Sequence, residues 1–154
     1  MTESQSTLIA KAIERCLLHI AKDSGYLTDA GSSVHRGWFA HAIQSRSATF
    51  PLIAIQPDTQ SVEKASGTGR EFRIADSFRL VVATDDVAHP ADLLKDCMRD
   101  VRRALALNWE AEITSIPGVR APDIGTAEFA LSADSPHTLA AMPVGITFTE
   151  KHEA

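Results

Sequence analysis

Residues 72–84 constrain the fold most, because polar and apolar side chains alternate along them. The apolar set is Phe72, Ile74, Phe78, Leu80 and Val82, and the polar set is Arg73, Ser77 and Arg79. A period of two predicts a strand with one buried and one solvated face. Asp76 falls on the apolar parity, so we expect a bulge or turn there in place of an unpaired buried carboxylate.

Two segments, 6–22 and 90–107, predict amphipathic helices that can cover the apolar face of such a sheet. Their apolar stripes are Ile9, Ala12, Ile13, Cys16, Leu17 and Ile20, and Leu94, Cys97, Met98, Val101 and Leu105. We expect Cys16 and Cys97 to be small core residues. Three acidic residues of the second helix each precede a basic residue by three positions: Asp92, Asp96 and Asp100. Such a ladder is typical of a solvated outer face.

Further apolar or alternating runs predict strands at 34–40, 50–56, 125–132 and 143–150. Because only two helices are available, both are expected to pack on the same face of the sheet. The expected fold class is α+β, with a mixed, mostly antiparallel sheet of about five strands and two helices packed on one face. A chain of 154 residues fits a single domain.

Two stretches show no periodicity. Residues 57–71 are polar and contain Ser-Gly-Thr-Gly-Arg at 66–70, so we expect a long flexible loop there, a feature that is usually functional or mobile in a compact domain. Residues 151–154 are polar as well, and we expect a frayed C-terminal tail.

The composition excludes several classes of protein. The chain has 15 Lys and Arg against 20 Asp and Glu, a net charge of −5, which argues against a protein that coats nucleic acid or an anionic membrane. No apolar run approaches the roughly 20 residues that cross a bilayer. The polar first residues lack the layout of a signal peptide, so we expect a cytoplasmic protein. Two distant cysteines give neither a disulfide framework nor a zinc site.

No motif in the chain predicts a reaction. Residues 67–69 (Gly-Thr-Gly) begin like a phosphate loop but lack the following Gly-Lys-Ser/Thr. Ser61 and Lys64 have the spacing of penicillin-recognising enzymes without their partner motifs. His35 and His41 would lie about 20 Å apart on a strand, too far to share a metal. We therefore expect a non-enzymatic protein with no catalytic residues, no metal site and no cofactor.

Four residues are candidates for contacts with a partner: Leu18, Arg70, Arg73 and Arg79. Leu18 falls on the polar side of the first helix. It is either a lone exposed leucine, which is common, or a contact with a neighbouring subunit. The arginines lie on the expected loop and on the polar face of 72–84. They are either the solvated side of a sheet or a surface for an acidic partner or a phosphate backbone.

The order of segments along 6–150 points to a family. After the first helix the chain runs through 25–31 (Gly-Tyr-Leu-Thr-Asp-Ala-Gly), 34–37 (Val-His-Arg-Gly), 50–55 (Phe-Pro-Leu-Ile-Ala-Ile), 78–82 (Phe-Arg-Leu-Val-Val), the helix at 92–105, and the strands at 127–131 and 144–148. In size, element order and texture the chain resembles the tail terminator proteins of long-tailed bacteriophages, the minor tail or tail completion family. No single motif is specific, because this family has no catalytic signature.

The resemblance implies a homo-hexameric ring at the head-proximal end of the tail tube. Such a ring binds the last tube ring, ends polymerisation and presents a surface to the head-tail connector or stopper. DNA would pass through it without sequence-specific binding, and no membrane is involved. The protein would reside in the virion neck, and in the host cytoplasm during assembly. The loop at 58–70, with Arg73 and Arg79, would contact the tube or the adjacent subunit and become ordered on docking.

Two alternatives stay open. The first is another phage neck component, such as a head-tail stopper or adaptor, which the docking partner would distinguish. The second is a small ligand-binding or enzymatic α+β domain, which requires a concave pocket with convergent polar groups.

Overall fold

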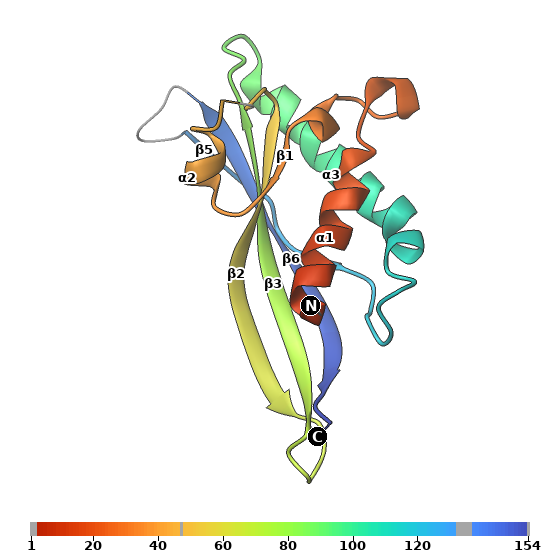
Figure 1. Cartoon of the computed structure of the whole chain (residues 1–154). Helices are drawn as coiled ribbons and strands as arrows, with labels where there is room; N and C mark the ends of the chain where they lie inside the picture. The colour runs from red at the N-terminus through yellow and green to blue at the C-terminus, as the bar shows by residue number, and fades with distance from the viewer. Residues whose placement is uncertain (1–2, 47, 132–136, 154) are drawn as a thin grey trace.

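The computed structural model describes residues 3–46, 48–131 and 137–153. The elements in chain order are α1 (Gln5–Leu18), the 3-10 turns η1 (Lys22–Ser24) and η2 (Ala30–Ser32), β1 (Val34–Arg36), α2 (Phe39–Ala42), β2 (Leu52–Lys64), β3 (Glu71–Thr84), α3 (Pro90–Glu112), β4 (Asp123–Ile124), β5 (Glu128–Leu131) and β6 (Thr138–Lys151). Figure 1 shows three long strands, β2, β3 and β6, that form the body of the sheet. The expected α+β fold is confirmed.

The described residues form a six-stranded sheet with the order β1-β2-β3-β6-β4, and β5 pairs with β6 beside β4. β1 runs parallel to β2, and the other pairs are antiparallel. The sheet is therefore mixed and mostly antiparallel, as expected. It has one strand more than expected because the segment after α3 contributes β4 as well as β5.

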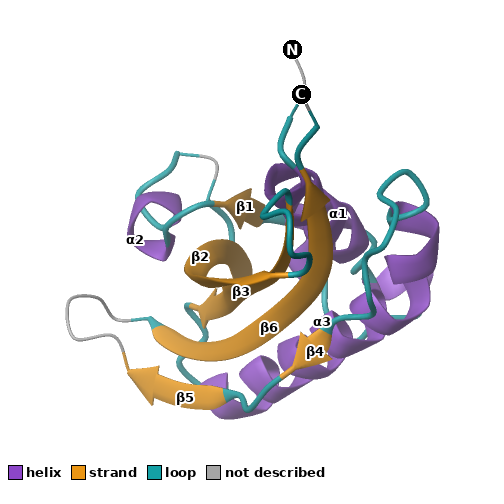
Figure 2. Cartoon of the chain, turned by 90° about the horizontal axis from the view of Figure 1, so that it is seen from below, coloured by secondary structure: helices purple, strands orange, loops and turns teal. Residues whose placement is uncertain are grey.

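Helices α1 and α3 cover one face of the sheet, as the two apolar stripes predict (Figure 2). Helix α2 lies on the other face, where Ala42 packs with Leu52, Ala54 and Val81 in a second, smaller cluster. The alternation at 34–40 predicts one strand, but β1 ends at Arg36 and α2 begins three residues later, at Phe39.

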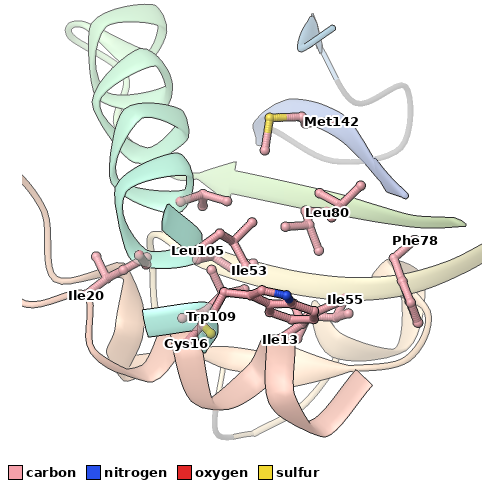
Figure 3. Close-up of a cluster of buried hydrophobic side chains, with 14 of the residues drawn as sticks. Ile13, Cys16, Ile20, Ile53, Ile55, Phe78, Leu80, Leu105, Trp109 and Met142 are labelled. Atoms are coloured by element: carbon pink, nitrogen blue, oxygen red, sulfur yellow. The ribbon is translucent and has the colours of Figure 1, made fainter. Parts of the chain in front are cut away.

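The main core lies between α1, α3 and the sheet. Figure 3 shows Ile13 and Cys16 of α1 and Leu105 and Trp109 of α3 gathered over the strands, with Leu80 of β3 among them. All five side chains are at most 3% exposed. Cys97 is fully buried as well, so the expectation that both cysteines are small core residues is confirmed.

The loop expected at 57–71 is wrong for residues 57–64 and 71, and only residues 65–70 lie outside the strands. β2 continues through this segment to Lys64, and β3 begins at Glu71, so the two strands form one long hairpin whose turn is short. A register shift between Pro57 and Gln60 accommodates the proline, which has no N–H for the ladder. The strand continues past this shift because β3 supplies hydrogen-bonding partners along its whole length.

Other boundaries differ from the sequence analysis. α1 ends at Leu18 in place of residue 22, and α3 continues to Glu112, past the expected end at 107. The strand expected at 125–132 is β5, and residue 132 lies outside the described residues. The expected fraying of 151–154 is wrong for its first two residues. Lys151 belongs to β6, and the backbone N–H of His152 donates to the Arg70 carbonyl at 2.8 Å; residue 154 lies outside the described residues.

Candidate functional site

The first candidate interaction surface is the end of the sheet that carries the turn between β2 and β3. There β2, β3 and β6 run on past the start of α1 (Figure 1). We call residues 60–76 and 146–152 the arm. Its strands pair to their ends, with Phe72 of β3 between Lys64 on one side and Glu150 on the other. The arm is therefore a hydrogen-bonded three-stranded sheet.

One face of the arm is turned away from α1 and α3, and it is exposed and polar. Its cross-strand rows are Glu63–Arg73–Thr149 and Ser61–Ala75–Thr147. Arg73, Ala75 and Glu63 are exposed. We call this surface the open face. It offers small hydroxyl side chains and one charged row to a neighbouring surface.

The structure places the four candidate residues at separate points of the surface. Arg73 and Arg79 project from the open face of β3, six residues and therefore about 20 Å apart along the strand. Arg70 is exposed in the hairpin turn. Leu18 is 54% exposed at the end of α1, in the helix layer on the opposite side of the sheet. Arg73 and Arg79 therefore share one face of β3, whereas Arg70 lies in the turn and Leu18 on the opposite side of the sheet.

Arg79 lies at a hollow that the sequence analysis did not predict. The hollow has a volume of about 240 Å³ and is lined by Arg79, Thr126, Glu128, Ala141 and Pro143. Arg79 and Pro143 are register partners, and Glu128 pairs with Ala141. No local pattern joins Arg79 to Glu128, because only the pairing of β3 and β5 with β6 places them together.

A larger hollow of about 630 Å³ lies between the arm, the start of α1 and the loop after α3. It is lined by Gln5, Glu71, Pro117, Gly118, Thr149 and Lys151. Its two charged side chains, Glu71 and Lys151, pair with each other at 3.7 Å. Their charges offset each other within the hollow.

Asp76 is a buried carboxylate on the helix-facing side of the arm. The bulge that we expected at this residue lies opposite, in β2, and Asp76 itself stays in register with Gln60 and Ile146. Ser6 Oγ in the first turn of α1 donates a hydrogen bond to Asp76 Oδ2. The expected bulge at Asp76 is therefore wrong, because hydrogen bonds satisfy the carboxylate within the regular strand.

Burial raises the pKa of Asp76 above the usual 3.8, while hydrogen bonds from Ser6 and Gln60 oppose this rise. The unfolding free energy therefore falls as the pH rises from about 3.8 through the raised pKa, because the folded state holds the proton longer. We expect Asp76→Asn to remove this part of the pH dependence and to stabilise the protein at neutral pH. Urea titrations of the wild type and the variant at several pH values measure the free energy of unfolding.

Asp85→Asn is the control for this prediction, because Asp85 is exposed just after the same strand. Its unfolding curve should follow the wild type across the acid range. An Asp76→Asn protein that is less stable than the wild type at neutral pH would contradict the prediction. It would show that the carboxylate is needed in its ionised form.

The two cysteines are structural. Burial, the largest cause, raises the pKa of Cys16 to about 12 and that of Cys97 to about 12. Because the thiolate is the reactive form, neither thiol is a nucleophile in the folded state near neutral pH. Thr28 contributes a side-chain hydrogen bond that lowers the pKa of Cys97, but less than burial raises it.

Within residues 3–46, 48–131 and 137–153, no three His, Cys, Asp or Glu side chains gather closely enough to hold a metal ion. In the same ranges no helix is long and apolar enough to cross a bilayer. Asp86 Oδ1 accepts hydrogen bonds from the backbone N–H groups of Ala88 and His89, at 2.8 and 3.4 Å. The acidic pair at 85–86 therefore forms the turn before α3.

β5 is more exposed than its alternating sequence indicates. Its apolar residues Phe129 and Leu131 are 46% and 81% exposed. β5 lies at the edge of the sheet, beyond the cover of α3, and alternation alone does not reveal an edge position.

Comparisons with known proteins do not assign the chain to a family. No family model matches it, and no curated protein sequence matches it at a significant level. The class that the fold defines is therefore a mixed-sheet α+β domain with two helices on one face and a projecting three-stranded arm.

Proposed function

We propose that this chain is a structural virion protein that caps the head-proximal end of a bacteriophage tail tube. In this role it ends tube polymerisation and provides the docking surface for the head-tail connector. The observation that supports the proposal best is the arm, whose open face is polar and exposed and carries Arg73. Copies arranged in a closed ring can meet through such a surface, because a head-to-tail contact repeats around a rotation axis.

Two further features support this proposal. The segment order resembles that of the tail terminator family, and the net charge of −5 suits a ring through which DNA must slide, since phosphate contacts retain DNA in a salt-dependent way. Arg73 and Arg79 suit the tube or the adjacent subunit as partners, because both project from one face at separate heights along β3.

A direct test is to add the purified chain to isolated tail tubes and image the tube ends. We expect an annular particle of six copies, each of 16.6 kDa, at one end only. A turnover activity that a single side-chain change abolishes, in preparations without any annular form, would overturn the proposal in favour of an enzyme.

Shortening the arm is expected to prevent capping. Replacing residues 64–72 with Asn-Gly joins Glu63 to Arg73, which are already cross-strand partners, through a favoured two-residue turn. The shortened protein should fold, because the buried core residues of β2 and β3 lie outside the replaced segment. Virions assembled with it should carry tails of irregular length, measured by electron microscopy.

Thr68→Ala is the control, because Thr68 is exposed in the hairpin turn and its substitution leaves the arm at full length. Virions with this change should have tails of normal length. If the shortened arm also gives tails of normal length, the arm has no role in capping.

A further inference from the structure

The two outer edges of the sheet differ in how they are protected against pairing. Beyond β1, the outer edge of β2 carries Pro57, a register shift, and the charged residues Glu63 and Lys64. These are the features with which proteins prevent unwanted pairing at an edge. At the other edge, the described residues leave β5 paired with β6 alone. β5 has one charged residue, Glu128, and neither proline nor a register shift.

The side chains of β5 are exposed on both faces of the sheet. Phe129 and Leu131, register partners of Ala140 and Thr138, lie on the helix-facing side. Glu128 lies on the other side, at the hollow that contains Arg79. A strand added along β5 would find apolar contacts on one face and a carboxylate on the other.

An apolar groove continues this edge along β6. It has a volume of about 280 Å³, and its lining includes Leu105 and Trp109 of α3, Pro122, and Ile124 of β4. Ile124 pairs with Val144 of β6, and Glu128 pairs with Ala141. Groove and edge are therefore about 10 Å apart along β6, within the reach of one short extended peptide.

We propose that the β5 edge and this groove together bind an extended segment of another protein. The segment adds a strand to β5 through backbone hydrogen bonds, and one apolar side chain fills the groove, as in other complexes formed by strand addition. Glu128 beside β5 and Glu110 in the groove lining select a segment with apolar residues at alternate positions and basic residues between or beside them. This site does not depend on the proposed function in tail assembly.

A second copy of this chain fits the same site poorly. Its own β5 carries Glu128 and no basic residue. Pairing of two β5 strands would bring acidic side chains together, which destabilises a strand pair. The acidic residues at the edge and in the groove lining therefore favour a different chain.

The test uses a ten-residue peptide in which Val and Leu alternate with Lys and Thr, and a control peptide with the same residues rearranged at helical spacing. We expect the alternating peptide to bind the full chain with micromolar affinity, measured by calorimetry, and to slow backbone hydrogen exchange at 128–131. The double variant Phe129→Lys, Leu131→Lys should weaken binding at least tenfold. Both side chains are exposed, so the variant should fold.

Leu107→Lys is the matched control, because Leu107 is 61% exposed on the side of α3 away from the groove, and it should bind the peptide like the wild type. Three results would overturn the proposal: equal binding of the two peptides, an unchanged affinity of the double variant, or no saturable binding. A dimer of the wild type that the double variant converts to a monomer, seen by light scattering, would identify a second copy as the occupant and would also overturn it.

Discussion

Asp100→Ala is expected to lower the free energy of unfolding by about 3–5 kcal/mol. Asp100 is fully buried on α3. Its carboxylate accepts hydrogen bonds from the backbone N–H groups of Leu27 and Thr28, at 3.1 and 2.8 Å, and from Thr28 Oγ1 at 2.8 Å. Alanine would leave the two buried donors of Thr28 without this acceptor, at about 1–3 kcal/mol each. Urea unfolding followed by tryptophan fluorescence measures the loss.

Asp96→Ala is the matched control, one turn earlier on the same helix, where Asp96 is exposed. Its effect should stay within about 0.5 kcal/mol. Thr28→Val should fall between the two, because it removes one donor and keeps the carboxylate. If Asp100→Ala and Asp96→Ala had equal effects, the hydrogen bonds to the loop would not contribute to stability.

The burial of Asp100 contradicts its predicted place on the outer face of α3. The spacing of Asp100 and Arg103 predicted an outer, solvated ladder on α3, yet Asp100 faces inward and Arg103 lies over the Tyr26 ring at 5.7 Å. The i, i+3 pattern describes only the helix itself. It carries no information about the loop at 26–30, where the N–H groups of Leu27 and Thr28 have their acceptor in Asp100.

The apolar stripes were predictive, because each helix must bury one face against the sheet. The same reasoning found β3, whose apolar parity is buried from Ile74 to Val82. It missed the outer part of β2, since from Pro57 to Lys64 this strand is exposed along its length. A strand that buries neither face has no reason to alternate, so its pairing with β3 leaves no periodicity in the sequence.

The candidate interaction surfaces were predictable only in part. Arg73 and Arg79 were assigned correctly to one face of a strand, because parity along a strand is a local property. The β5 edge and the groove beside α3 were missed. They depend on the strand order, in which β4 and β5 both pair with β6, and strand order is set by contacts between distant segments.

Gly31→Ala is the second substitution with a large expected effect, about 3 kcal/mol of destabilisation. A Cβ atom at Gly31 would lie 2.5 Å from the Ile20 carbonyl oxygen and 2.8 Å from that of Leu17. Both atoms belong to the backbone at the end of α1, which cannot move aside as a flexible side chain does. The Gly31 N–H also donates to the Ile20 carbonyl at 2.9 Å, so the clash would separate η2 from α1.

Gly67→Ala is the control for this prediction, because a Cβ atom at Gly67 meets nothing within 4 Å; its effect should stay within about 0.5 kcal/mol.

Gly31 joins the loop to α1, and Asp100 joins the same loop to α3. The double variant Gly31→Ala, Asp100→Ala should therefore lose less unfolding free energy than the sum of the two single losses, because either change alone already releases the loop. Full additivity would mean that the two helices hold the loop independently.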